Sequence, residues 1–181
     1  MDTTNSRFIA FLNSWRATLI DNDSYQKSDK ENYEKCLQLY NEIITGKNII
    51  NVDDSDFVNL FCEGGPVTAI EATTDINSSN RMEEVITSIK KAIAGYDGSI
   101  NNIMLFIFIG KSTPLLMEEM SFFNNLISTF ESDTQVVWGI KQVEESDLLR
   151  VAMLFNYSHK WAQYCNFSKL CPKSAHRIRN F

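Results

Sequence analysis

The sequence predicts an α+β domain, an arrangement in which helices pack on a sheet. Helical stretches at the start are followed by strands and helices in alternation, and then by two consecutive strands. This order suits a two-layer sandwich, with two helices on one face of a four-stranded mixed sheet and an N-terminal helical arm added. With 181 residues, 44% of them apolar, the chain can form one ordinary core.

The first part of the chain predicts two helices. Apolar residues recur at spacings of three and four over 8–19 and over 33–44, which places them on one face of each helix. The polar stretch 21–30 separates the two helices, and Gly46 is placed to end the second. These helices form the expected arm.

A loop over 51–56 is expected to lead into a short helix that ends before Gly64-Gly65-Pro66. Asp53 and Asp56 are suitable cap and first-turn residues for that helix. For an arbitrary sequence, helix capping is the ordinary interpretation of this pair of aspartates.

The remaining strands and helices follow from periodicity and from glycine and proline positions. Strands are expected at 67–73, 103–109, 135–142 and 148–156, and helices at 79–94 and 113–130. Ile103–Ile109 is apolar on both faces, as in a central strand covered on at least one side and, we expect, on two. Asn80 and Glu83 could cap the first of these helices, and Pro114 has the favoured first position of the second.

Composition indicates a protein of a reducing compartment. The longest apolar run, Ile103–Ile109, is far shorter than the ~20 residues that cross a bilayer, and the first twenty residues lack the layout of a secretion signal. We therefore expect a cytoplasmic protein. Its cysteines form no C-x-x-C pair and are expected to be reduced; they are Cys36, Cys62, Cys165 and Cys171.

Charge is distributed unevenly along the chain, whose net charge is −6. Residues 51–150 hold sixteen acidic and six basic side chains, whereas 151–181 hold five basic side chains and no acidic one. A basic tail could contact a polyanion, but the acidic body would repel it. Nucleic acid is therefore not an expected partner.

One segment resembles a known family. Ile44-Thr-Gly-Lys-Asn-Ile-Ile-Asn-Val-Asp-Asp-Ser-Asp-Phe57 resembles the pattern I-T-x-P-G-L-I-N-V-D-F-A-D-V of FtsZ, in which a long helix leads into the synergy loop. The two lengths agree without a gap. Lys47 stands where proline is usual and Asn48 where glycine is usual, and asparagine tolerates the left-handed conformation better than other non-glycine residues.

The resemblance continues in register over about residues 31–157. It includes Glu63-Gly-Gly65, Asn80-Arg81, Ala92-Ile93, Gly110, Glu118, Val136-Val-Trp-Gly139 and Arg150-Val151. The chain is thus similar to the C-terminal domain of an FtsZ-like cell-division protein of the FtsZ/tubulin superfamily. This resemblance implies an arm over 1–46, an FtsZ C-terminal-like domain over 47–157 and a basic tail over 158–181.

The resemblance also implies a role for the acidic loop. In FtsZ-like proteins this loop reaches the neighbouring subunit's GTP site, where its acids position the water that attacks the γ-phosphate. Asn51, Asp53 and Asp56 match those positions. The same residues can serve as caps and as catalytic groups in trans, so both interpretations stay open.

No nucleotide or metal site is expected in the chain itself. The family's glycine-rich phosphate loop has no counterpart among the seven glycines. Gly110-Lys-Ser-Thr113 is only the end of a Walker pattern, because Leu105 stands where its first glycine would be. A zinc site is not expected either, because the spacing matches no common finger; its candidate ligands would be His159, Cys165, Cys171 and His176. We therefore expect no cofactor and no enzymatic activity of the chain alone.

Three functions follow from this reasoning. The first is an interaction module that binds an FtsZ-type partner, or itself, and caps or tunes polymerisation without binding GTP. The second is an activator that supplies Asn51, Asp53 and Asp56 to a partner's GTP hydrolysis. The third is a self-associating structural scaffold in which the loop is only a helix cap.

Overall fold

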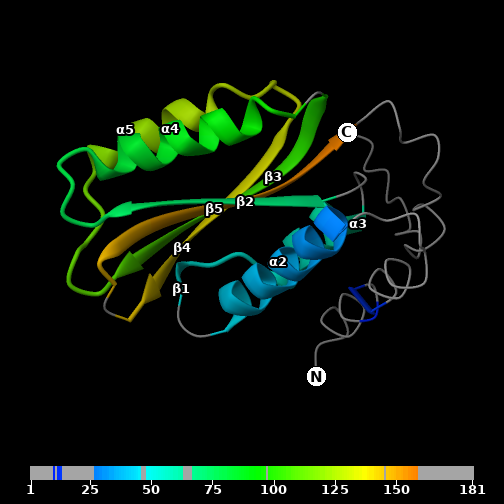
Figure 1. Cartoon of the computed structure of the whole chain (residues 1–181), viewed down its shortest axis with the longest axis horizontal. Coiled ribbons are helices and arrows are strands. Elements are labelled where there is room, and N and C mark those ends of the chain that lie inside the picture. The colour runs from blue at the N-terminus through cyan, green and yellow to red at the C-terminus, as the bar shows by residue number, and fades with distance from the viewer. Residues whose placement is uncertain are drawn as a thin grey trace, which may run out of the picture.

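The computed structural model describes residues 10, 12–13, 27–45, 48–62, 67–96, 98–144 and 146–158. Its helices and strands alternate in the order expected for an α+β domain (Figure 1). The helices are α2 (Lys27–Ile44), α3 (Asp54–Cys62), α4 (Arg81–Ile93) and α5 (Glu119–Ile127). The strands are β1 (Asn48–Ile50), β2 (Val67–Asp75), β3 (Ser99–Gly110), β4 (Gln135–Val143) and β5 (Leu148–Ser158).

The strands form one mixed sheet in the order β1-β4-β3-β5-β2. β3 and β4 are parallel, and the other neighbouring pairs are antiparallel. This confirms the α+β class, the mixed sheet and the four predicted strands. The described sheet has five strands rather than four, because Asn48–Ile50 adds a short edge strand beside β4.

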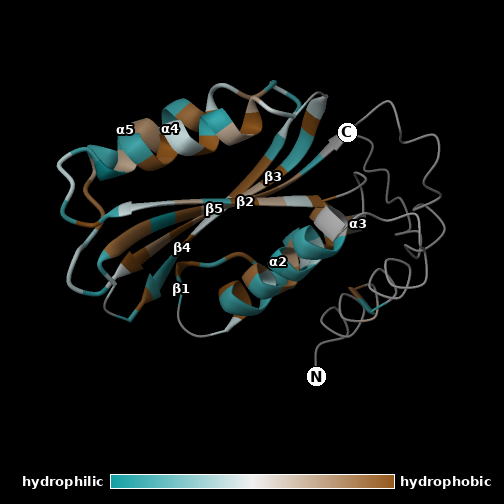
Figure 2. Cartoon of the chain, viewed as in Figure 1, coloured by the Kyte–Doolittle hydropathy of each residue, from teal (hydrophilic) through white to brown (hydrophobic). Residues whose placement is uncertain are grey.

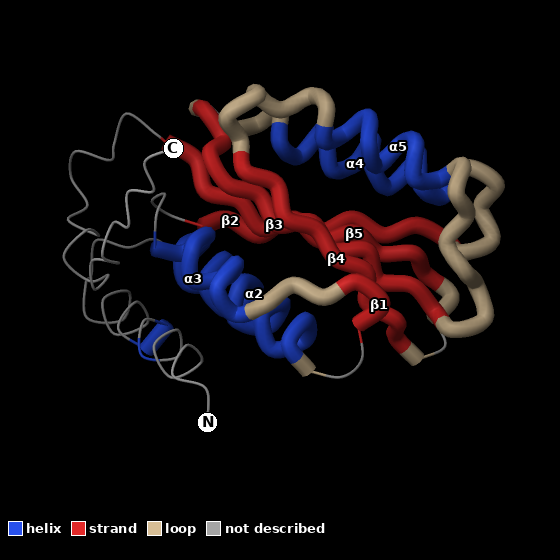
Figure 3. Tube along the Cα trace, turned by 180° about the vertical axis from the view of Figure 1, so that it is seen from behind, coloured by secondary structure: helices blue, strands red, loops and turns tan. Residues whose placement is uncertain are grey.

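Helices cover both faces of the sheet (Figure 3). Along β3, Met104, Phe106 and Phe108 pack with α2 and α3. The residues between them pack with α4 and α5 on the other face; they are Ile103, Leu105, Ile107 and Ile109. α4 and α5 therefore share one face, as expected, while α2 and α3 add a further layer on the other. Hydrophobic residues run along the strands of the sheet (Figure 2).

Two predicted helix boundaries are wrong. α2 begins at Lys27, inside the stretch expected to be a polar break, so the helix continues beyond Tyr33, where its apolar stripe starts, into polar residues. α5 begins at Glu119 rather than at Thr113. The segment before it is held as a loop, since Arg81 donates a hydrogen bond to the Pro114 carbonyl at 3.0 Å.

The caps of α4 also differ from the expectation. Asn80 has the N-cap position but makes no side-chain cap hydrogen bond. Glu83 is exposed, and the neighbouring Glu84 accepts hydrogen bonds from Thr74 and Ser78 instead. The first turn of α4 is therefore tied to the end of β2 through Glu84.

Several predictions fall outside the described residues. The helix predicted over 8–19 is described only at Ala10, Leu12 and Asn13, which are helical. The turn over 63–66 and the tail over 159–181, with the four candidate zinc ligands, are not described. Within the described residues, no helix is long and apolar enough to cross a membrane.

Gly110 ends β3, and Lys111 and Ser112 form the turn that follows. Leu105 lies fully buried within the same strand. This confirms that Gly110-Lys-Ser-Thr113 is a turn after a strand. Cys36 is a free thiol whose pKa burial raises to about 12, as expected of a reduced core cysteine.

Candidate interaction site at the start of helix α3

The candidate site is the loop that joins β1 to α3, and its two aspartates cap α3 reciprocally. Asp53 Oδ1 accepts hydrogen bonds from the backbone N–H groups of Ser55 at 2.9 Å and Asp56 at 3.1 Å. In return, the Asp53 N–H donates to Asp56 Oδ2 at 3.1 Å. Asp53 is thus the N-cap and Asp56 the third helical residue of a capping box. The capping interpretation of this pair is confirmed.

The loop is exposed, although its residues serve the helix. Asn51 and Asp53 are exposed, and Asp56 is half-buried. The hydrogen bond from the Ser55 hydroxyl is the main cause that lowers the pKa of Asp53. Burial opposes it, and the N–H groups of Asp56 and Ser55 lower the pKa further. Asp53 therefore keeps its negative charge at neutral pH.

The cap engages one oxygen of each aspartate. Among the described hydrogen bonds, those to Asp53 all reach Oδ1 and the one to Asp56 reaches Oδ2. Asp53 Oδ2 and Asp56 Oδ1 therefore take no part in the described hydrogen bonds of the cap. No cluster of three or more candidate metal ligands exists in the part of the chain that the structure describes.

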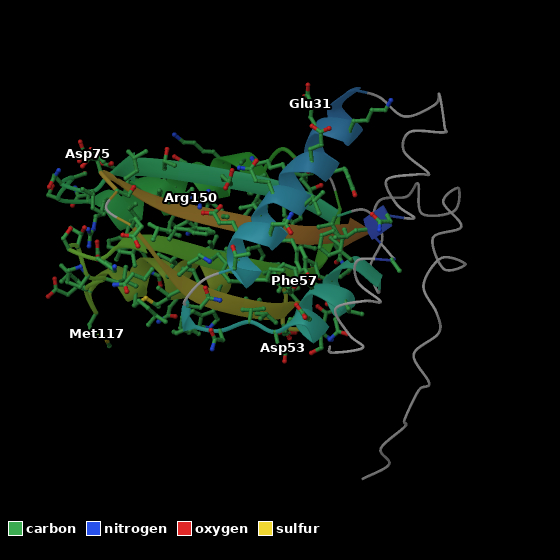
Figure 4. All side chains as sticks on the ribbon, turned by 90° about the horizontal axis from the view of Figure 1, so that it is seen from below. Glu31, Asp53, Phe57, Asp75, Met117 and Arg150 are labelled. Atoms are coloured by element: carbon green, nitrogen blue, oxygen red, sulfur yellow. The ribbon has the colours of Figure 1, made fainter. Side chains whose placement is uncertain are left out.

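Phe57 anchors this loop to the core. It is fully buried. The centre of its ring lies 4.9 Å from the centre of the Tyr40 ring in α2, edge to face, and 6.4 Å from the centre of the Phe106 ring in β3. Burial, and then the neighbouring Asp54 carboxylate, raise the pKa of Tyr40 to about 12. Figure 4 shows Asp53 at the edge of the molecule and Phe57 farther inward, near α2.

The other side of the loop is fixed by β1. Asn48 Nδ2 donates a hydrogen bond to the Ile43 carbonyl at 3.1 Å and so closes the end of α2. Asn48 does not use the left-handed conformation that asparagine tolerates, because no described non-glycine residue has a positive φ. Asn48 instead pairs as a strand residue with Lys141 of β4.

Lys141 is a structural link near this loop that sequence reasoning missed. Its side chain is buried, and its ammonium group donates to the carbonyls of Glu42 and Thr45 at the end of α2. Burial lowers the pKa of Lys141, and the Glu42 charge opposes this effect. In the sequence, Lys141 is noticeable only as a lysine inside a strand that is otherwise about half apolar. Its position does not show that its partners, Glu42 and Thr45, lie roughly a hundred residues earlier in the chain.

Asn156 was also missed, and it holds the far end of α3. It is fully buried on β5, and its Nδ2 donates to the Leu60 carbonyl at 2.9 Å. Its Oδ1 accepts the Asn102 N–H of β3 at 2.9 Å. A buried polar residue in an apolar strand is the signal that could have indicated such a link.

Among known proteins, neither a protein-family model nor a curated protein sequence matches the chain. Solved structures match it at low identity. An FtsZ dimer of M. jannaschii matches with 18% identity and a TM-score of 0.57, over 80% of this chain and 41% of that one.

Two filament structures match over a similar part. TubZ of the two-stranded TubZ-Bt filament has 12% identity and a TM-score of 0.55, over 86% of this chain and 40% of that one. CetZ2 of Haloferax volcanii, a GTPγS-bound protofilament, has 16% identity and a TM-score of 0.51, over 82% and 46%. The chain spans less than half the length of these proteins, and its described part has the fold of an FtsZ/tubulin-like C-terminal domain.

Proposed function

We propose that the chain is an interaction module that presents the exposed loop Asn51–Asp53 and the first turn of α3 to an FtsZ-type partner or to a second copy of itself. The observation that carries the proposal is the capping box, which leaves one oxygen each of Asp53 and Asp56 outside the cap. A rigid, charged and exposed loop binds a partner at little ordering cost.

The comparisons support self-association or association with a related protein. The TubZ structure is a filament, the CetZ2 structure is a protofilament, and the FtsZ structure is a dimer. A domain with this fold is suited to pack against such a polymer and to cap or tune it. The module would work in the cytoplasm. It would bind no GTP itself, because none of its seven glycines lies in a glycine-rich phosphate loop.

A second function is favoured by the charge on the same loop. Asp53 and Asp56 would position water against a phosphate held by the partner, with Asn51 beside them. The lowered pKa of Asp53 suits this role, because an ionised carboxylate can orient and polarise water. The chain would then act as an activator in trans.

One experiment tests both functions. An FtsZ-type GTPase from the same organism is assayed for GTP hydrolysis and for sedimenting polymer, with and without the full chain. The interaction module predicts changed polymer mass, and the activator predicts faster hydrolysis. No change in either quantity, together with no self-association of the chain, contradicts the proposal.

Paired asparagine substitutions separate docking from catalysis. Asp53→Asn with Asp56→Asn keeps cap acceptors but removes both charges. If the charges act on water, this variant abolishes the effect on hydrolysis while it still changes polymer mass. If hydrolysis responds as strongly as with the unchanged chain, the role in trans is wrong and docking alone remains. Calorimetry with GTP and the chain alone should show no binding.

A further inference from the structure

An open hollow lies where α4 and α5 both end, on the face of the sheet opposite α3. Its volume is about 370 Å³, within the usual size of ligand pockets. Its lining is mostly apolar, from Ile93 of α4, Ile100 of β3, and Leu126 and Phe130 at the end of α5. Such a lining favours an aromatic or aliphatic side chain.

The strand register places the exit of β5 beside this hollow. Ser99, which lines the hollow, pairs directly with Ser158, the last residue of β5. Residues 159–181 therefore continue from the margin of the hollow. An extended chain advances about 3.5 Å per residue, so the side chain of Trp161 begins within about 10 Å of Ser158.

The composition of residues 159–181 suits the hollow. They carry three large aromatic side chains within the first nine positions, Trp161, Tyr164 and Phe167, and five basic side chains with no acidic one. Glu131 lines the hollow, and the exposed Asp133 lies in the turn beside it. Lys90 of α4 also lines the hollow, so its acidic side is the one at Glu131. A basic residue next to an aromatic one, as in Lys160-Trp161, matches the apolar hollow on that side.

The N-terminal residues are a poorer occupant. Leu12 is buried in the core cluster of the other face, with α2 and α3. The Tyr33 hydroxyl of α2 also donates to the Leu12 carbonyl at 3.0 Å. Leu12, a described residue of the N-terminal part, thus lies on the far side of the sheet from the hollow.

We infer that the hollow binds residues 159–167 of the same chain, with Trp161 as the apolar anchor and Lys160 beside Glu131. Burial of a large apolar side chain such as that of Trp161 shifts the equilibrium between the undocked and docked forms by roughly tenfold or more, so the docked form dominates. This site is separate from the loop at Asp53, so its test is independent of the proposed function.

Trypsin cleavage after Lys160 tests the inference, because cleavage requires the undocked form. The rate is measured by mass spectrometry in the full chain and compared with a synthetic peptide of residues 156–167. Docking predicts cleavage at least about tenfold slower in the chain than in the peptide. Equal rates in chain and peptide overturn the inference.

A matched pair of substitutions locates the binding site. Ala94 lines the hollow and Ala92 does not, although both are exposed at the end of α4. Ala94→Trp fills the mouth of the hollow and should remove the protection of Lys160, whereas Ala92→Trp should leave it unchanged. Equal effects of the two substitutions overturn the inference.

The segment itself supplies a second variant that leaves the described core untouched. Trp161→Ala, compared with a peptide carrying the same substitution, should lose the protection in the chain. Retained protection contradicts the role of Trp161. Protection that rises with chain concentration contradicts docking within one chain, because it shows an occupant from a second copy.

Discussion

Asp53 and Asp56 exchange hydrogen bonds in both directions: the N–H of each donates to a carboxylate oxygen of the other, and both donor–acceptor distances are 3.1 Å. The pair therefore fixes the backbone where β1 passes into α3, and it does so at an exposed edge of the molecule. Any function of these carboxylates in a complex is added to an existing structural role. Stability and function can be separated by choosing substitutions that keep the cap.

Asp53→Ala should lower the free energy of unfolding by about 1 kcal/mol, because two backbone N–H groups of α3 lose their acceptor. Asp53→Asn should cost only a few tenths of a kcal/mol, because asparagine caps nearly as well. Urea unfolding followed by circular dichroism measures both. Glu34→Ala on the exposed face of α2 is the control and should change stability by less than about 0.5 kcal/mol. Equal losses for Ala and Asn would contradict the capping role.

Local sequence signals predicted this loop well, because capping depends on residues that are three positions apart. The alternation along β3 and the helical stripe of α4 were predictable for the same reason. β1 was not, since three residues are too short to show a period and only β4 makes them a strand.

Long-range contacts account for the remaining errors. The helix expected from Thr113 begins only at Glu119, because Arg81, thirty-eight positions earlier, binds both Glu119 and the Pro114 carbonyl. Lys141 likewise closes the end of α2 from a distant strand. Such partners are set by the tertiary fold, and no periodicity or local motif in one sequence identifies them.

Gly139→Ala should destabilise the chain and loosen the edge that supports the loop. A Cβ at Gly139 would lie 2.6 Å from Cε1 of Phe106 and 3.0 Å from the carbonyl oxygen of Ile50. Overpacking of this kind costs about 1–3 kcal/mol. Urea unfolding measures the loss, and hydrogen exchange at the β1–β4 pairing should accelerate. The cost of Gly139→Ala should be smaller in a Phe106→Leu background than in the unchanged chain, and an equal cost in the two backgrounds would contradict the proposed clash.

Arg150→Lys should destabilise the contact between α2 and the sheet. The guanidinium group binds Glu42 of α2 and, at 3.1 Å, Glu71 of β2, and it lies 3.8 Å from the centre of the Phe108 ring. Lysine has no planar fork to bind both carboxylates and stack on the ring. Because these side chains are about a quarter exposed, the expected loss is about 1 kcal/mol.

Thermal and urea unfolding measure the effect of Arg150→Lys, with Lys111→Met as the control. Lys111 pairs with Glu144 at 3.6 Å, but both side chains are well exposed, so its removal should change stability by less than about 0.5 kcal/mol. In 1 M salt the control should show no effect, while part of the Arg150 effect should persist, because stacking on Phe108 is less screened than an exposed ion pair. An equal salt response in both variants would show that Arg150 acts only as a surface charge.

Glu119→Gln should lower stability at neutral pH by about 3 kcal/mol, because it leaves the buried guanidinium of Arg81 without its charge partner. The two side chains are joined by hydrogen bonds of 2.5 and 2.8 Å, and Glu119 also accepts the Leu116 N–H at 2.8 Å. Burial alone would raise the pKa of Glu119, but these hydrogen bonds and the Arg81 charge hold it below its usual value. The charged carboxylate is therefore the form that stabilises the fold.

The sign of the pH dependence follows from the lowered pKa. Since the pKa of Glu119 is lower in the folded chain than the value of about 4.3 expected when unfolded, its contribution is fully present above that value. It is lost as the pH falls through the folded pKa. Urea unfolding of the unchanged chain and of Glu119→Gln between pH 7 and pH 3 should therefore show a stability difference that shrinks on acidification. Acids such as Asp53 titrate in both chains, so their effect cancels in this difference. A stability difference that stayed constant or widened on acidification would contradict the ionised Arg81–Glu119 pair.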